Sequence, residues 1–347
     1  MSIPVFCLDW HINQTPSQQA LLIEPLAPYM LFNRIGWDGS TLISFQSEWL
    51  KNSPIVFYQL PPPESVFNFP DARIIWIPMW DQARGYDREW WSRLPKSLRV
   101  VSFSKEVSQR ARAVGLNTFD VRYFMPPSDY GQADWNKPRT LFYWNRTGMV
   151  GEVFLRKLCD AIDVEILLFR QRIDPRVASW CDYELPEKIG RTVVKKLTFA
   201  SDGADAHYEY LKYLSQANIF IAPRLFEGVG LSFIEALASG CAVFAYDAPT
   251  MNEYIIHKTN GYLLQQSHKT IFNMIYGQMT KKMQRVANHF GYAPPSLYYP
   301  VTERQNWAEI KKLDVQSLGN QARQGQLEGY EVWKSCLPDY ASFILDW

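Results

Sequence analysis

The stretch of residues 218–264 constrains the fold of this chain more than any other part of it. Its short apolar run at residues 219–222 predicts a buried strand, and the loop that follows carries two glycines. The apolar spacing that begins at Leu231 predicts a helix, which Gly240 ends, and residues 241–246 predict the next strand. This order of strand, glycine loop, helix and strand is half of a doubly wound parallel sheet, which binds ligands at the carboxyl ends of its strands.

The size and composition of the chain are those of a globular α/β protein. Its 347 residues are enough for two domains, and 47% of them are apolar, which excludes disorder. A net charge of +1 makes nucleic acid an unlikely partner. The five scattered cysteines predict buried thiols rather than disulfides or a metal site. Without a membrane-spanning run or a leader pattern, the chain is expected to be soluble and cytoplasmic.

Alternating strands and helices predict parallel sheets in both halves of the chain. The first half, residues 1–137, is predicted to be a Rossmann-like domain, and the prolines of residues 125–138 indicate a linker at its end. One of its helices has Ser104 at the N-cap position and Gly115 at its end. The predicted strands of this domain are 4–8, 55–59, 73–77 and 99–103, and its predicted helices are 18–29 and 105–114.

A second Rossmann-like domain is predicted at residues 138–325, followed by a helical tail at 326–347 that we expect to pack back on the first domain. The helical pattern from Val315 onward is predicted to break near Gly329 and Pro338, because both residues disfavour a helix interior. Further strands are predicted at 140–144, 164–169 and 193–197, and further helices at 152–162, 205–217 and 267–291.

Charged residues and glycines gather in the loops that follow the predicted strands of the second domain. Backbone N–H groups that open onto a helix N-terminus suit an anion, although a plain turn between strand and helix has the same glycines. An arginine at the end of a strand can clamp a phosphate with two donors, although a surface salt bridge is the alternative. The residues concerned are Glu227, Gly228, Val229, Gly230, Leu231, Glu235, Arg146, Arg170 and Arg224.

The sequence EGVGLSFIEALASGCAVFAYD resembles the signature of retaining, GT-B-fold glycosyltransferases of family 4, also called group 1, which use nucleotide-sugar donors. In that pattern two glutamates, here Glu227 and Glu235, are separated by seven residues. The resemblance continues at Asn252, Glu253 and Gly261 and, upstream, at LFYWNR. It implies two Rossmann-like domains that face a central cleft, with the donor bound to the second.

Three positions depart from the family pattern. Asn145 stands where the family has a glycine before the arginine, and Val150 and Gly151 stand where it has a Lys-Gly pair. Many members have a His-Asp pair where this chain has Trp80 and Asp81. We therefore expect Arg170 or Arg224 to supply the positive charge that the absent lysine would give to the donor diphosphate.

The resemblance assigns a role to each main residue. It implies that Glu227 contacts the donor sugar and the charge that grows on its ring, that Glu235 accepts hydrogen bonds from two ribose hydroxyls, and that Asp81 orients or deprotonates the acceptor. The alternatives from the residues alone are a solvated loop acid for Glu227, a helix-dipole acid for Glu235 and an inert loop acid for Asp81. Retention of configuration and independence of metal ions and other cofactors are also implied by the family.

The implied reaction is transfer of a hexose from a UDP- or GDP-sugar to a hydroxyl of a glycan or lipid-linked acceptor in cell-surface polysaccharide synthesis. Between Arg84 and Arg112 the chain has eight basic and three acidic residues around Trp90 and Trp91. These residues form either a peripheral contact with an anionic membrane or a solvated face with two core tryptophans. The alternative functions are an inactive glycosyltransferase-like subunit, a nucleic-acid-modifying glycosyltransferase and a nucleotide-sugar epimerase.

Overall fold

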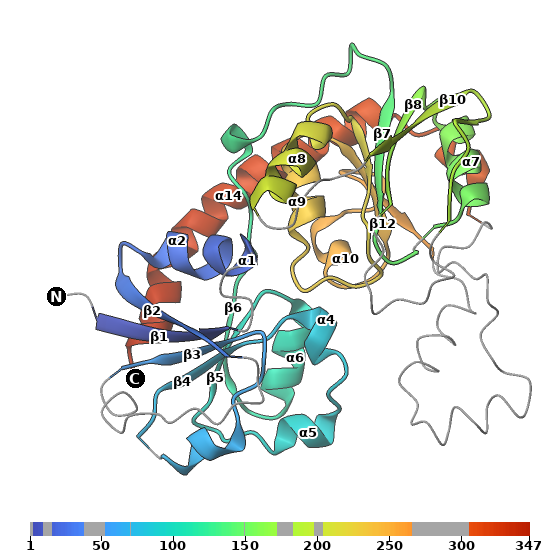
Figure 1. The fold of residues 1–347 in the computed structure, drawn as a ribbon. Coiled ribbons are helices and arrows are strands. Elements are labelled where there is room, and N and C mark those ends of the chain that lie inside the picture. The colour runs from blue at the N-terminus through green and yellow to red at the C-terminus, as the bar shows by residue number, and fades with distance from the viewer. Residues whose placement is uncertain are drawn as a thin grey trace, which may run out of the picture. The chain divides into compact units, whose positions relative to one another are not determined.

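The structure, a computed structural model, describes residues 3–9, 16–37, 53–69, 71–148, 150–171, 183–197, 204–265 and 305–347. Its contacts divide the chain into two compact units, each built around its own sheet. Unit 1 contains Met1–Phe124, Glu227–Leu231 and Glu328–Trp347, and unit 2 contains Met125–Phe226 and Ser232–Leu327. Both units have the α/β organisation that the alternating pattern predicts (Figure 1).

Unit 1 has a six-stranded sheet in the order β2-β1-β3-β4-β5-β6, and all its strand pairs are parallel. Every residue of β3 and β4 is buried, as expected where helices cover both faces of a parallel sheet. The strands are β1 (Ile3–Asp9), β2 (Met30–Gly36), β3 (Ile55–Tyr58), β4 (Ile74–Ile77), β5 (Arg99–Ser102) and β6 (Asn117–Asp120).

The helices of unit 1 lie on both sides of this sheet (Figure 1). The predicted helix at 18–29 is a continuous helical stretch that starts at α1 (Pro16–Gln18), passes through a π-helical segment and ends with α2 (Glu24–Leu26). Ser104 occupies the N-cap position of α6 without a capping hydrogen bond from its side chain. The other helices are α4 (Trp80–Ala83), α5 (Arg88–Ser92) and α6 (Lys105–Ala113), with short 3-10 turns at Glu64–Asn68 and, in unit 2, Pro127–Asp129.

Unit 2 has a seven-stranded sheet in the order β13-β12-β11-β7-β8-β10-β9. Its strand pairs are parallel except for β9 with β10. Its strands are β7 (Thr140–Asn145), β8 (Ile166–Gln171), β9 (Lys188–Ile189), β10 (Thr192–Leu197), β11 (Ile219–Ile221), β12 (Ala242–Tyr246) and β13 (Tyr262–Leu264).

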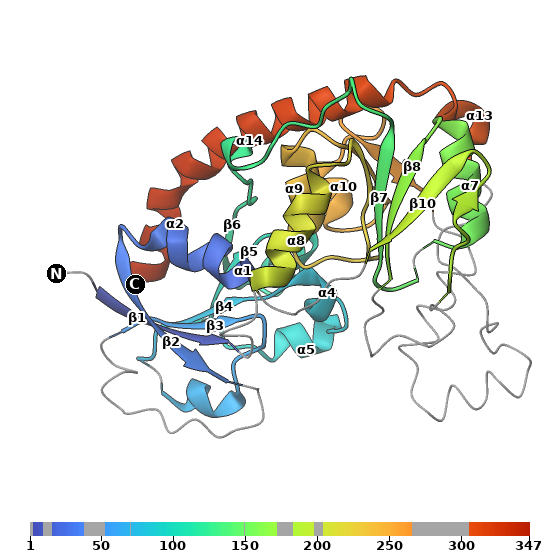
Figure 2. The same ribbon diagram turned by 45° about the horizontal axis from the view of Figure 1, so that its top comes forward.

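Helices α8 and α9 pack on one face of the unit 2 sheet, and α7 lies on the other (Figure 2). On the first face, Tyr210 of α8 packs against Phe142 of β7, with 5.6 Å between ring centroids. On the second, Phe154 of α7 packs against Trp307 of α13. The predicted helix at 267–291 lies outside the described residues. The helices are α7 (Glu152–Ala161), α8 (Ala204–Leu214), α9 (Leu231–Ala238), α10 (Met251–Tyr254) and α13 (Trp307–Ile310).

The C-terminal segment forms one continuous helix, α14 (Val315–Leu345), so the predicted breaks near Gly329 and Pro338 are wrong. Two of its three glycines, Gly319 and Gly329, instead allow close packing. A Cβ atom at Gly329 would collide with the ring of Phe124, and one at Gly319 would collide with the carbonyl oxygen of Gly240. Residues 315–327 of the helix belong to unit 2 by their contacts, and residues from 328 onward belong to unit 1.

Candidate active site

Except for Asp81, the predicted site residues lie at the carboxyl ends of β7, β8 and β11 or in the segments that follow β7 and β11, where the direction of winding reverses. From β7 the chain passes to β8 and β10 on one side, and β11, β12 and β13 lie on the other. The loops that leave β7 and β11 are therefore neighbours, and Thr147 Oγ1 in the first donates a hydrogen bond to the Pro223 carbonyl in the second, at 2.9 Å. Open α/β sheets bind their ligands at such a switch point.

Glu235 lies within α9 with only 3% of its surface exposed. Its carboxylate is hydrogen-bonded to a histidine of α8: His207 Nε2 lies 2.7 Å from Glu235 Oε1. Burial raises the pKa of the Glu235 carboxyl, and the hydrogen bond from His207 opposes that rise. The same hydrogen bond raises the pKa of His207. Because Glu235 lies outside the first turn of α9, the alternative of a helix N-terminal acid that complements the dipole is wrong.

The other glutamate, Glu227, is 6% exposed in the loop after β11, so it is not a solvated loop acid. The loop requires its glycines for two different reasons. Gly230 has a φ of +84°, in the left-handed region that side chains disfavour. A Cβ atom at Gly228 would lie 2.8 Å from the Met79 Cβ and 3.0 Å from Asp81 Oδ1, which places Asp81 beside the loop within unit 1.

Two of the predicted arginines converge on one tryptophan. Arg170 of β8 and Trp144 of β7 are register partners, so their side chains share one face of the sheet. The Arg170 guanidinium carbon lies 4.3 Å from the Trp144 ring centroid, and that of Arg146 lies 5.2 Å from it. Arg170 is only 3% exposed. Among the described residues the Trp144 Nε1 hydrogen has no acceptor, although it is buried. This edge of the sheet therefore carries two positive charges and a buried donor.

The departures from the family pattern after β7 have a structural explanation. The Asn145 side chain organises the turn: its oxygen accepts from the Gly148 N–H at 3.0 Å and from the Tyr143 hydroxyl at 3.2 Å. Its amide donates to Gln171 at 2.7 Å. Val150 is completely buried, and its carbonyl accepts from the Tyr183 hydroxyl. A lysine at position 150 would have to place its charge in this core.

Of the remaining predicted residues, Val229 is buried, whereas Leu231 and Arg224 are half-buried. Sequence reasoning missed His207, Trp144 and the structural role of Asn145. The alternation of side chains along a strand already places Phe142, Trp144 and Arg146 on one face, so Trp144 could have been found. No comparable signal exists for His207, which lies 28 residues before its partner.

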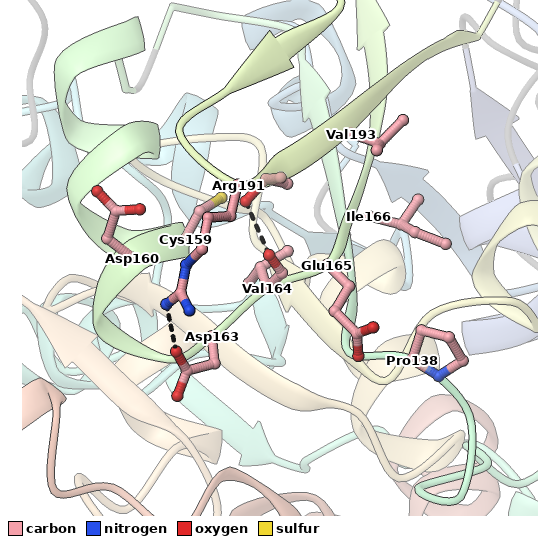
Figure 3. A pocket seen from close by; sticks show the side chains of 10 residues that line it. Pro138, Cys159, Asp160, Asp163, Val164, Glu165, Ile166, Arg191 and Val193 are labelled. Carbon is pink, nitrogen blue, oxygen red and sulfur yellow. Dashed lines mark hydrogen bonds and ion pairs between the residues drawn. The ribbon is translucent and has the colours of Figure 1, made fainter.

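A pocket of about 390 Å³ lies at the opposite, amino edge of the same sheet (Figure 3). Two of its three acids, Asp163 and Glu165, have hydrogen-bond partners in the structure. Arg191 binds Asp163 at 2.9 Å, and Glu165 accepts from the backbone of Arg139 at 3.2 Å. None of the predicted site residues lines this pocket. Its lining is Pro138, Cys159, Asp160, Asp163, Val164, Glu165, Ile166, Arg191, Thr192 and Val193.

The basic segment of unit 1 divides into structural and exposed residues. Arg99 donates to the carbonyls of Phe343 and Asp346, and Arg110 donates to three carbonyls at the end of α4. Arg112 pairs with Asp120. Trp91 is buried and Trp90 is half-buried. The exposed basic side chains of this segment are Arg88, Arg93, Lys96, Lys105 and Arg112.

Two further observations concern the described part of the chain alone. There, no three His, Cys, Asp or Glu side chains gather in a way that could hold a metal ion. None of its helices combines the length and the apolar character that a membrane span requires.

Comparison with known proteins gives a family match over part of the chain. Residues 202–275, which include both glutamates and the glycine loop, match the family described as "Glycosyl transferases group 1". A search among curated proteins gives no significant match.

Solved structures match the whole chain. Sucrose-phosphate synthase from Thermosynechococcus elongatus aligns at a TM-score of 0.57 and 13% identity, over 97% of this chain and 98% of the other. HepE from Anabaena, in complex with UDP and glucose, aligns at a TM-score of 0.56 and 11% identity, over 98% of this chain and 100% of HepE. WaaG, a glycosyltransferase involved in lipopolysaccharide biosynthesis, aligns at a TM-score of 0.52 and 11% identity, over 99% of this chain and 100% of WaaG. These likenesses show a GT-B fold for the chain, and the match to the group 1 glycosyltransferase family covers residues 202–275.

Proposed function

We propose that the protein is a retaining glycosyltransferase that moves a hexose from a UDP- or GDP-sugar to a hydroxyl of a glycan or lipid-linked acceptor. The observation that carries the proposal is the pair of guanidinium groups on Trp144, at the switch point of a sheet whose next loop holds the glycine turn. The family match and the UDP and glucose held by HepE support a nucleotide-sugar donor.

Arg146 and Arg170 stabilise the departing diphosphate. Breaking the bond between sugar and nucleotide develops negative charge on the leaving group, and catalysis depends on donors that are already aimed at it. A guanidinium binds phosphate oxygens through two parallel hydrogen bonds. In this proposal Arg170 replaces the lysine that the family has after the first strand of its second domain, and Trp144 holds both guanidinium groups. The reaction then proceeds without a metal ion or another cofactor.

Glu235 binds the ribose of the donor and Glu227 binds its sugar. A buried carboxylate that keeps free lone pairs can accept from two vicinal hydroxyls, which is the pattern of a ribose. Glu227 lies in the loop that opens α9, where it can stabilise positive charge as it develops on the sugar ring. The backbone N–H groups of residues 228–231 supply further donors.

The acceptor is bound by unit 1, where Asp81 orients or deprotonates its hydroxyl. The closeness of Asp81 to Gly228 supports this role. We also propose that the protein acts in the cytoplasm at the inner face of the membrane, with Arg88, Arg93 and Lys105 on anionic headgroups, because these side chains are exposed. The acceptor would then be a precursor of a cell-surface polysaccharide.

The direct test is a binding and turnover panel. UDP, GDP, ADP and dTDP are first compared by thermal shift, and the corresponding nucleotide sugars are then assayed for release of the diphosphate with and without acceptor. One nucleotide should raise the melting temperature, and its sugar should be turned over with retention of configuration. Binding without turnover would favour the alternative of an inactive subunit, whereas a changed sugar without acceptor would indicate an epimerase. Absence of binding by every nucleotide would overturn the proposal.

A further inference from the structure

His207 has a position that the transfer reaction alone does not explain. It lies on α8 in the first turns after the described start at Ala204, and this helix packs on the same sheet face as Trp144 and Phe142. Its ring stacks on Tyr210 at a centroid distance of 6.2 Å with an interplanar angle of 10°. Tyr210 in turn donates from its hydroxyl to the Ser232 carbonyl of α9, at 2.8 Å. The imidazole is therefore held from two sides.

The contact between His207 and Glu235 joins a half-exposed group to a buried one. The His207 side chain is 38% exposed and that of Glu235 is 3% exposed. The imidazole is thus in contact with solvent on one side and with an almost fully buried carboxylate on the other. An isolated buried carboxylate is unfavourable, so an adjacent imidazolium favours the ionised form of Glu235 and opposes the rise that burial causes in its pKa.

We propose that His207 is the positioning residue of the ribose site: by holding Glu235 Oε1, it fixes the carboxylate in the ionised form and rotamer that accept the ribose hydroxyls. The proposal rests on the function proposed above. A carboxylate has about four acceptor positions, so a single hydrogen bond from His207 leaves enough capacity for two hydroxyls. His207 acts through Glu235 and does not itself touch the donor.

Within the described residues, the titratable groups that act on Glu235 are His207 and Tyr210, both from α8. Cys241 and Tyr130 lie around Tyr210. Tyr210 and Cys241 are buried, and burial raises the pKa of each, so neither one ionises near neutrality. Removing His207 therefore leaves burial as the main influence on the Glu235 pKa, and the carboxyl becomes ionised only at a higher pH.

The experiment measures affinity for the nucleoside diphosphate found in the panel and for its 2′-deoxy analogue, by calorimetry. The variants are His207→Phe, which keeps the ring, His207→Gln, which keeps an N–H donor, and Tyr208→Phe, a control at a neighbouring position that is 72% exposed. The wild type should prefer the ribonucleotide. His207→Phe should weaken ribonucleotide binding about tenfold, the effect of losing one hydrogen bond to a charged group, and leave binding of the deoxy analogue nearly unchanged.

His207→Gln should recover most of the preference, and Tyr208→Phe should match the wild type. The deficit of His207→Phe should shrink as the pH is raised, because Glu235 without its partner ionises at a higher pH. Equal losses for both nucleotides, or no loss, would overturn the role of His207 while leaving the proposed function intact. If Glu235→Gln also leaves the preference for the ribonucleotide unchanged, the proposed role of Glu235 in binding the ribose is wrong as well.

Discussion

The two edges of the unit 2 sheet differ in how far their charged side chains are exposed. At the carboxyl edge, Glu235 and Arg170 are each 3% exposed. At the amino edge, the side chains of Asp163 and Arg191 form an ion pair while 66% and 81% exposed. An exposed pair contributes about 0–1 kcal/mol, whereas burying a charge is unfavourable unless specific partners compensate it. Buried charged side chains are therefore found at the carboxyl edge. Buried ionisable groups with specific charged partners are typical of functional sites.

The comparison also shows that a cavity alone does not define a site. The amino edge holds a pocket of about 390 Å³ (Figure 3), and two of its three acids have a cationic or a backbone partner. The carboxyl edge instead brings together two guanidinium groups, a buried indole N–H and a buried carboxylate. We interpret the amino edge as surface structure and the carboxyl edge as a donor site.

The largest effect is expected at Glu227. Replacing it with Gln removes a negative charge beside the developing positive charge of the sugar, so the turnover number should fall about 10²–10³-fold. Nucleotide affinity should change little, because the proposed contact is with the sugar. Steady-state kinetics and calorimetry on the same preparation separate the two quantities. Unchanged turnover would remove Glu227 from the mechanism.

An intermediate effect is expected at Asn145, which organises the turn after β7. Asn145→Ala leaves the Gly148 N–H and the Tyr143 hydroxyl without their shared acceptor, so the free energy of unfolding should fall by about 1–3 kcal/mol. Urea denaturation measures this difference. The exposed Asn136→Ala is the matched control and should stay within about 0.5 kcal/mol of the wild type.

The smallest effect is expected at the amino edge. Asp163→Asn should lower stability by no more than about 1 kcal/mol, because the ion pair with Arg191 is exposed. Turnover and nucleotide affinity should equal those of the wild type. A loss of activity that stability does not explain would mean that the amino edge also takes part in function.

The sequence predicted the core of each sheet better than its edges. The strands β11 and β12 are short apolar runs that are buried throughout, and such runs in a sequence predict buried strands. The edge strands β2 and β6 were missed, because they are largely exposed and their apolar residues show no clean alternation. Local propensity also failed at α14, where Gly319 and Gly329 lie inside the helix and pack closely against Gly240 and Phe124.

Within the candidate site, spacing along the chain located the glutamates and the arginines but not their partners. Glu227, Glu235 and the glycines are close in sequence, so a linear pattern contains them. The pairing of Trp144 with Arg170 depends on the register of two strands, and that of His207 with Glu235 on the packing of two helices. Such contacts follow from tertiary structure, which spacing alone does not specify.

The most direct test of the account compares one arginine from each edge. Calorimetry should measure binding of the nucleoside diphosphate from the panel to Arg170→Met and to Arg191→Met, after circular dichroism has shown that both variants are folded. Methionine keeps an apolar stem at each position and removes only the charged donors. We expect Arg170→Met to bind about ten- to a hundredfold more weakly and Arg191→Met to bind like the wild type. Equal affinity of the two variants, or a greater loss for Arg191→Met, would contradict a donor site at the carboxyl edge.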